Sequence, residues 1–237
     1  MTVWRRWGAV LLISTLLAAC AEEPATDTGA EPAAEEHAVA GVEAVGLGEA
    51  MGQIRGHHLA AIELYDAGDE KGAAVHAGHP IAEILASVQS ELAEHDPAIG
   101  DELESALDAV ADGVAQGAPV EDLQASIEDA AAVTQEVLGA VVGEDADTPS
   151  FKGSVIAALL ATAAHEYEEA VGDKGIRLLA EFQDGYAFVQ EARRLYEEIA
   201  GGSGCSRRRR RGHAFIQRVG HRRAARHRGT RIRRSGR

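Results

Sequence analysis

Residues 55–80, RGHHLAAIELYDAGDEKGAAVHAGHP, have the pattern of two helices joined by a tight turn. Apolar residues recur every three to four positions before the turn, and Gly68 stands where a helix can end in the left-handed conformation. A second helix is expected from Glu70. Pro80 is expected to begin a further helix, because a proline in the first helical turn sacrifices no hydrogen bond. The stretch therefore predicts an antiparallel helical hairpin.

The surrounding region, residues 48–200, continues the helical pattern and has almost no strand pattern. Pro97, Pro119 and Pro149 each stand where a new helix can begin. Residues 155–164 are apolar on all sides, which is typical of a helix packed inside a bundle. The region is predicted to be a single all-α bundle of five to six helices. The last helix is expected to bury one stripe, formed by Ile176, Leu179, Phe182, Tyr186, Val189, Tyr196 and Ile199.

The N-terminal segment has the pattern of an export signal. Residues 1–19 combine two arginines with an apolar run too short to span a bilayer, and they end in LAA before Cys20. This LAAC motif resembles the lipobox of bacterial lipoproteins. The resemblance implies that Cys20 carries lipid and anchors the chain at the periplasmic side of the outer membrane. Residues 20–47, rich in Ala, Glu, Pro and Gly, are expected to form a disordered acidic tether.

Charge divides the chain sharply at position 201. From Cys20 to Ala200 there are seven basic residues against all 38 acidic residues, a net charge of −31. Such a surface repels nucleic acid, so no nucleic-acid partner is expected. The Arg-rich tail, residues 201–237, holds 14 arginines and neither lysine nor acidic residues. Such a tail could bind nucleic acid or phospholipid head groups, or fold back on the acidic domain. The interpretation that we favour is a disordered segment or the product of a reading-frame error, in which case residues 203–237 are not the authentic C-terminus.

The hairpin carries four of the ten histidines of the chain. In an antiparallel hairpin, residues equidistant from the turn face each other, so His58 is expected to face His76 and His57 to face His79. His76 and His79 are three residues apart and share a helix face. Imidazole nitrogens suit iron, copper and zinc, and the sequence predicts a transition-metal site here. Further candidate ligands are Glu63, Glu83, His165 and Glu168.

Two short motifs resemble the imelysin family and the related periplasmic component of bacterial ferrous-iron uptake systems. His165 and Glu168 form a His-x-x-Glu motif, and Gly56-His57-His58 fits the start of a Gly-x-His-x-x-Glu motif. Ala61 stands where that second motif has glutamate, and Glu63 comes two residues late. The resemblance implies a helical bundle that handles iron or copper.

The sequence lacks the motifs of a serine triad, a zincin or a phosphate loop, and no histidine follows a glutamate at the spacing of di-iron enzymes. We therefore expect no enzymatic activity. The sequence predicts a lipid-anchored protein that binds a transition metal for uptake or buffering, with an envelope protein or transporter as partner. One alternative is an envelope interaction module whose histidines only pack. The second alternative is haem binding through two facing histidines.

Overall fold

A computed structural model describes residues 32–202 of the 237-residue chain. The predicted signal peptide, Cys20 and the Arg-rich tail from residue 203 lie outside the described residues. Within them, the predicted all-α fold is confirmed, with the helices packed in a bundle. No helix among residues 32–202 combines the length and the apolar composition that a membrane span requires.

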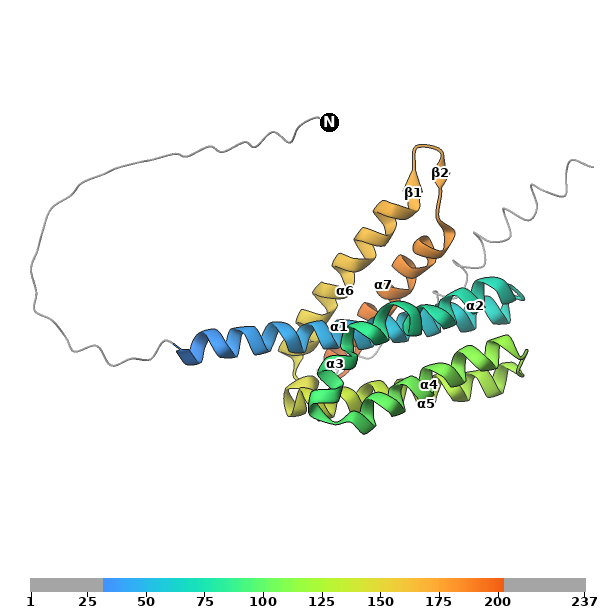
Figure 1. Ribbon diagram of the computed structural model, residues 1–237. Helices are drawn as coiled ribbons and strands as arrows, with labels where there is room; N and C mark the ends of the chain where they lie inside the picture. The colour runs from blue at the N-terminus through green and yellow to red at the C-terminus, as the bar shows by residue number, and fades with distance from the viewer. Residues whose placement is uncertain (1–31, 203–237) are drawn as a thin grey trace, which may run out of the picture.

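The described helices form three antiparallel pairs (Figure 1). In the first pair, α1 packs against α2 and η1, and α3 continues from η1 toward α4, while α4 pairs with α5 and α6 with α7. A two-stranded hairpin closes the far end of the third pair. The elements are α1 (Pro32–Asp66), α2 (Glu70–His79), the π-helical turn η1 (Pro80–Leu85), α3 (Ala86–His95), α4 (Pro97–Ala115), α5 (Val120–Val141), the 3₁₀ turn η2 (Gly143–Asp147), α6 (Pro149–Ala170), β1 (Val171–Gly172), β2 (Gly175–Ile176) and α7 (Leu179–Gly202).

The predicted hairpin between α1 and α2 is confirmed. Gly68 has a φ of +78°, and Asp69 caps α2 by accepting a hydrogen bond from the Gly72 amide. Pro80 begins a distinct helical element, η1, as expected, but the chain stays helical across it, so η1 follows α2 without a break. Proline cannot donate the usual helical hydrogen bond, and a turn of π-helix, η1, accommodates the missing bond.

Helix α1 begins at Pro32, so the predicted disordered tether is wrong for residues 32–47. Alanine and glutamate, which dominate this stretch, are strong helix formers. From Leu47 onward α1 packs into the core, and Leu47 itself is only 2% exposed. The helix therefore starts well before residue 48, where the composition had placed the beginning of the bundle. Residues 20–31 of the expected tether lie outside the described part of the chain.

Helix α6 lies at the edge of the bundle, which corrects the expectation that residues 155–164 are surrounded on all sides. Leu159 is fully buried against α1 and α7, whereas its neighbour Leu160 is 44% exposed. The outer face of this segment consists largely of alanine, which made the sequence look apolar on all sides although alanine tolerates exposure to solvent.

The last helix also differs from the prediction, because Ile176 belongs to β2 and Tyr196 is 62% exposed.

Three glycines on α1 allow the third helix pair to approach closely. A Cβ atom added at Gly48 would lie 2.5 Å from Val155 Cγ2, one at Gly52 would lie 2.9 Å from Leu159 Cδ1, and one at Gly56 would lie 2.6 Å from a carbon of the Phe188 ring. Real Cβ contacts are longer than these distances. The four-residue spacing of the glycines therefore creates a groove along α1 in which α6 and α7 lie.

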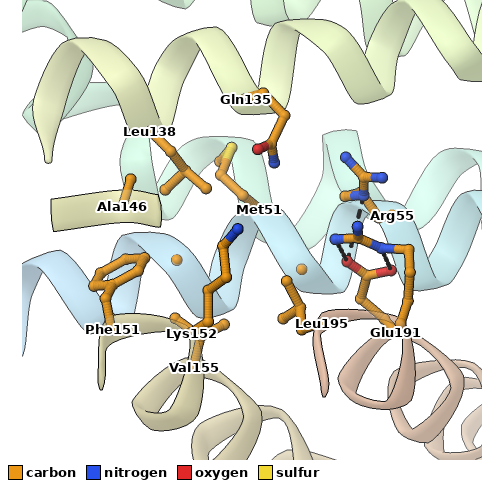
Figure 2. Close-up of a pocket in the computed structure, with 13 residues that line it drawn as sticks. Met51, Arg55, Gln135, Leu138, Ala146, Phe151, Lys152, Val155, Glu191 and Leu195 are labelled. Carbon is orange, nitrogen blue, oxygen red and sulfur yellow. Dashed lines mark hydrogen bonds and ion pairs between the residues drawn. The ribbon is translucent and has the colours of Figure 1, made fainter. Parts of the chain in front are cut away.

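A buried ion-pair network lies beside this groove (Figure 2). Glu191 on α7 is 5% exposed and lies between two guanidinium groups. Its Oε1 is 3.3 Å from Arg55 Nε and 2.7 Å from Arg194 Nη2. The adjoining pocket is lined by these charged groups, by Lys152 and by apolar side chains that include Met51 and Phe151. The network ties α7 to α1 in a part of the interface that also contains the glycine groove.

Candidate metal centre

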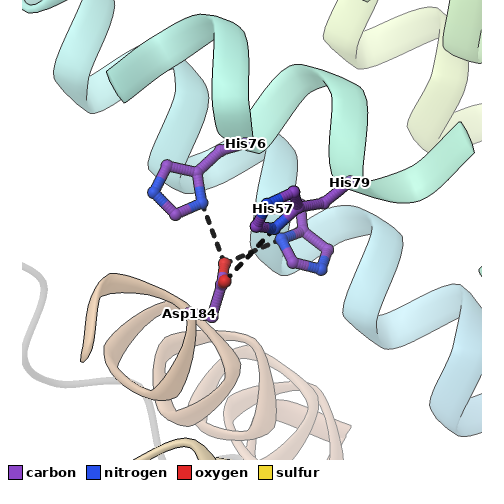
Figure 3. Close-up of side chains that lie close together, drawn as sticks. All are labelled: His57, His76, His79 and Asp184. Atoms are coloured by element: carbon purple, nitrogen blue, oxygen red, sulfur yellow. Dashed lines mark hydrogen bonds and ion pairs between the residues drawn. The ribbon is translucent and has the colours of Figure 1, made fainter. Parts of the chain in front are cut away.

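Four side chains from three helices converge on one point in the interior (Figure 3). His57 comes from α1, His76 and His79 come from α2, and Asp184 comes from α7. One potential ligand atom from each residue lies within 4.8 Å of the others. The spacing of three places His76 and His79 on the same face of α2, and the hairpin turn brings that face to α1.

All three histidines direct Nδ1 toward the carboxylate of Asp184. His57 Nδ1 is 2.7 Å from Oδ1, His76 Nδ1 is 2.9 Å from Oδ1, and His79 Nδ1 is 3.3 Å from Oδ2. Nitrogen and oxygen ligands lie about 2.0–2.2 Å from zinc and similar ions, which separates neighbouring ligand atoms by about 3 Å. The nitrogen-to-oxygen distances are therefore compatible with a three-histidine, one-carboxylate coordination sphere, as well as with hydrogen bonds to the carboxylate.

The site is buried on all but one side. His76 is completely buried, Asp184 and His57 are 2% and 3% exposed, and the His79 side chain is 17% exposed. Although Asp184 is near, the buried Nδ1 atoms of His57 and His79 make no hydrogen bond of normal geometry. Buried polar atoms normally have partners, and a cation among the three rings would supply one.

The charge states of Asp184 and His57 favour metal binding. Burial raises the pKa of Asp184, but the three surrounding imidazoles outweigh it and hold the pKa well below its usual range. Burial lowers the pKa of His57 despite the carboxylate beside it. The Asp184 carboxylate raises the pKa of the less buried His79. An ionised carboxylate and a neutral His57 are the forms that bind a metal.

Two imidazoles have oxygen atoms behind the nitrogen that faces away from the site. His76 Nε2 is 3.0 Å from Oε1 of Gln183, which is 4% exposed. His79 Nε2 is 3.9 Å from the Glu83 carboxylate, which is largely exposed. Histidine ligands of metals usually have such outer partners, which orient the ring.

The structure places the fourth histidine of the hairpin, His58, outside this site. His58 is buried, but its Nε2 has no hydrogen-bond partner and burial lowers its pKa to about 3. The predicted pairing of His58 with His76 is wrong. Consecutive helical residues point about 100° apart, and His57 faces α2, with its ring 6.2 Å from that of His76 and 5.0 Å from that of His79.

The structure does not bring the remaining predicted ligands to the centre. Glu63 lies outside the group of converging atoms. Glu83 approaches only the outer nitrogen of His79. The His165 side chain is 66% exposed and lies 3.6 Å from Glu169, while Glu168 is exposed. The His-x-x-Glu motif therefore lies on the outer surface of α6.

Sequence reasoning missed Asp184 and Gln183. The predicted stripe of the last helix placed both on its polar face, but residues 183–188 are all buried. A second stripe was available in the sequence, with Ala187, Glu191, Ala192 and Leu195 on the same face as Asp184. The sequence signal that could have identified Asp184 is its position as the one acidic residue in the largely apolar segment FQDGYAF, residues 182–188.

Comparison with known proteins finds one family. Residues 143–208 match the family described as iron permease-associated 4-helix bundle domain. No curated protein and no solved structure matches the chain. The matched segment is less than a third of the chain, and it contains α6, α7 and Asp184 but none of the three histidines. The helical hairpin that supplies the carboxylate is therefore similar to a domain associated with iron permeases.

Proposed function

We propose that this protein binds a transition-metal ion, with iron as its physiological cargo, through His57, His76, His79 and Asp184. The observation that carries the proposal is the convergence of three Nδ1 atoms on one buried carboxylate, two of them without a normal hydrogen bond. A buried carboxylate facing three imidazoles is costly unless a cation is held there. The donor set fits divalent iron, copper and zinc.

Iron is preferred because of the family match. The segment that supplies Asp184 is similar to a domain that is named for its association with an iron permease. By this likeness, the protein delivers iron to a membrane permease or buffers it beside one. The lipobox-like LAAC sequence supports anchoring at the membrane through Cys20, on the periplasmic side of the outer membrane.

A binding role is preferred to a catalytic one. His57, His76 and Asp184 are enclosed by α1, α2 and α7, so only the His79 side faces solvent. A small ion can reach such a site, whereas a larger substrate would have to displace a helix. Haem is disfavoured as the ligand, because imidazole rings 5.0–6.2 Å apart with a carboxylate between them leave no slot for a macrocycle.

Metal stoichiometry of the purified full-length chain tests the proposal. The metal-free protein is titrated anaerobically with Fe(II), and bound metal is measured after gel filtration. We expect one ion per chain for the wild type and none for Asp184→Asn or His76→Ala. His165→Ala and His95→Ala, which alter exposed histidines, serve as controls and should bind like the wild type. Equal binding by folded Asp184→Asn and wild-type protein would exclude this site.

The interaction-module alternative has its own test. Cross-linking of the anchored protein in cells should capture an iron permease, and the yield should fall in the Asp184→Asn variant if delivery requires a loaded site. Capture that is unaffected by this variant and by chelation would favour a partner that recognises the helical surface alone.

A further inference from the structure

We propose that Gln183 is a positioning residue that holds His76 in the tautomer whose Nδ1 is free to bind metal, and that its neutral amide keeps the ion exchangeable. This inference rests on the proposed function, because it concerns the same site. It goes beyond it by assigning a role to a residue that contributes no ligand atom to the coordination sphere.

The His76 ring makes two polar contacts, one at each nitrogen. Nε2 lies 3.0 Å from Gln183 Oε1, and Nδ1 lies 2.9 Å from Asp184 Oδ1, with the ring completely buried. Both partners are hydrogen-bond acceptors. A neutral imidazole has only one N–H, so one of its nitrogens must direct a lone pair at an oxygen. For a neutral ring, both contacts are satisfied together when a cation is held at Nδ1 while the Nε2–H group donates to Gln183.

The environment of Gln183 supports a dedicated role. Gln183 is 4% exposed, and its Nε2 is buried without a hydrogen-bond partner. Burying an amide that makes only one hydrogen bond costs stability, and an apolar side chain at this position would avoid that cost. The one bond that Gln183 does make is to His76. Gln183 is therefore in position to orient the His76 ring.

The amide also differs from the carboxylate that often lies behind a metal-binding histidine. A carboxylate makes the imidazole more basic and the metal bond stronger, whereas an amide orients the ring without adding charge. A protein that delivers a metal must also release it. The neutral partner therefore suits exchange, and replacement by glutamate should hold the ion longer.

The experiment compares Gln183→Leu and Gln183→Glu in the full-length chain, with Gln190→Leu on the same helix as control. Zn(II), which is diamagnetic, is the probe. We expect Gln183→Leu to bind Zn(II) about 10- to 100-fold more weakly. Gln183→Glu should restore or exceed wild-type affinity and release Zn(II) to a chelator more slowly, and Gln190→Leu should match the wild type.

Nitrogen-15 NMR of the His76 ring gives a readout that a merely structural role would not change. In the Zn(II)-loaded wild type and Gln183→Glu proteins, we expect hydrogen on Nε2 and metal on Nδ1. Wild-type affinity in Gln183→Leu, or hydrogen on Nδ1 in the loaded wild type, would overturn the proposal for Gln183. Absence of Zn(II) and Fe(II) binding in the wild type would instead overturn the proposed metal site itself.

Discussion

Gly56 of α1 lies so close to Phe188 of α7 that a methyl group on its Cα would be 2.6 Å from Phe188 Cδ1. The Phe188 ring also packs edge-on against His57, with the ring centroids 5.1 Å apart. Asp184 is one helical turn before Phe188 on α7. Because glycine has no side chain, Gly56 allows α1 and α7 to lie close together beside the contact between His57 and Asp184.

Substitution of this glycine should weaken both the fold and the metal site. In Gly56→Ala, the Phe188 ring or the backbone of α7 must move outward, and overpacking of this kind typically costs about 1–3 kcal/mol of unfolding free energy. The same movement should lengthen the contact between His57 and Asp184 and lower the affinity for metal. Urea unfolding and a Zn(II) titration measure the two effects.

Gly153→Ala on α6 is the matched control, because a Cβ at Gly153 would meet no atom within 4 Å. Alanine is the better helix former by about 1 kcal/mol, so this variant should be as stable as the wild type or more stable. Its metal affinity should not change. Equal behaviour of the two alanine variants would show that the close approach at Gly56 does not control the site.

His58 can be separated experimentally from the three histidines of the site. Its side chain is buried, its Nε2 has no hydrogen-bond partner, and its lowered pKa keeps it neutral. Replacing a buried polar group that lacks a partner with an apolar residue of similar size is often neutral or stabilising. His58→Leu should therefore retain metal stoichiometry and the free energy of unfolding. Loss of metal binding in this variant, with the fold intact, would place His58 in the site.

The sequence predicted the helices, the hairpin and three of the four converging residues because each depends on local spacing. Gly68 and Asp69 determine the turn, and the turn brings His57 beside His76 and His79. The fourth residue, Asp184, lies more than a hundred positions away, and only the packing of α7 in the glycine groove brings it there. Local periodicity allowed two buried faces for α7, and the contacts with α1 select the one that contains Asp184.

The buried carboxylate of Glu191 should contribute more to stability than an exposed one on the same helix. Glu191→Ala leaves Arg55 and Arg194 partly buried without their shared partner (Figure 2). Breaking a fully buried pair costs about 3–5 kcal/mol, and the loss here should be smaller because both guanidinium groups are partly exposed and Arg194 keeps Glu198 as a partner. Glu197→Ala removes an exposed pair with Arg193 and should cost at most about 1 kcal/mol. Chemical denaturation of the two variants measures the difference, and similar losses would contradict the role assigned to Glu191.

The pair formed by Glu166 on α6 and Glu181 on α7 should make stability depend on pH. Burial, followed by the hydrogen bond and charge of Glu181 and the charges of Asp184 and Glu169, raises the pKa of Glu166 from 4.5 to about 8. Between these values the folded chain retains a proton that the unfolded chain has lost. Because the folded state binds more protons in this window, the contribution of Glu166 to stability falls as the pH rises from 4.5 to about 8.

Glu166→Gln should remove this dependence, since the amide cannot ionise and still offers Glu181 a hydrogen-bond donor. With a chelator present, the variant should match the wild type near pH 4.5 and exceed it in unfolding free energy near pH 8. Glu168→Gln, at an exposed position on the same helix, corrects for the loss of one negative charge from an acidic domain. Only the Glu166 substitution removes the carboxyl group paired with Glu181. If both variants gain the same unfolding free energy near pH 8, the gain is therefore due to the lower net charge and not to the Glu166–Glu181 pair.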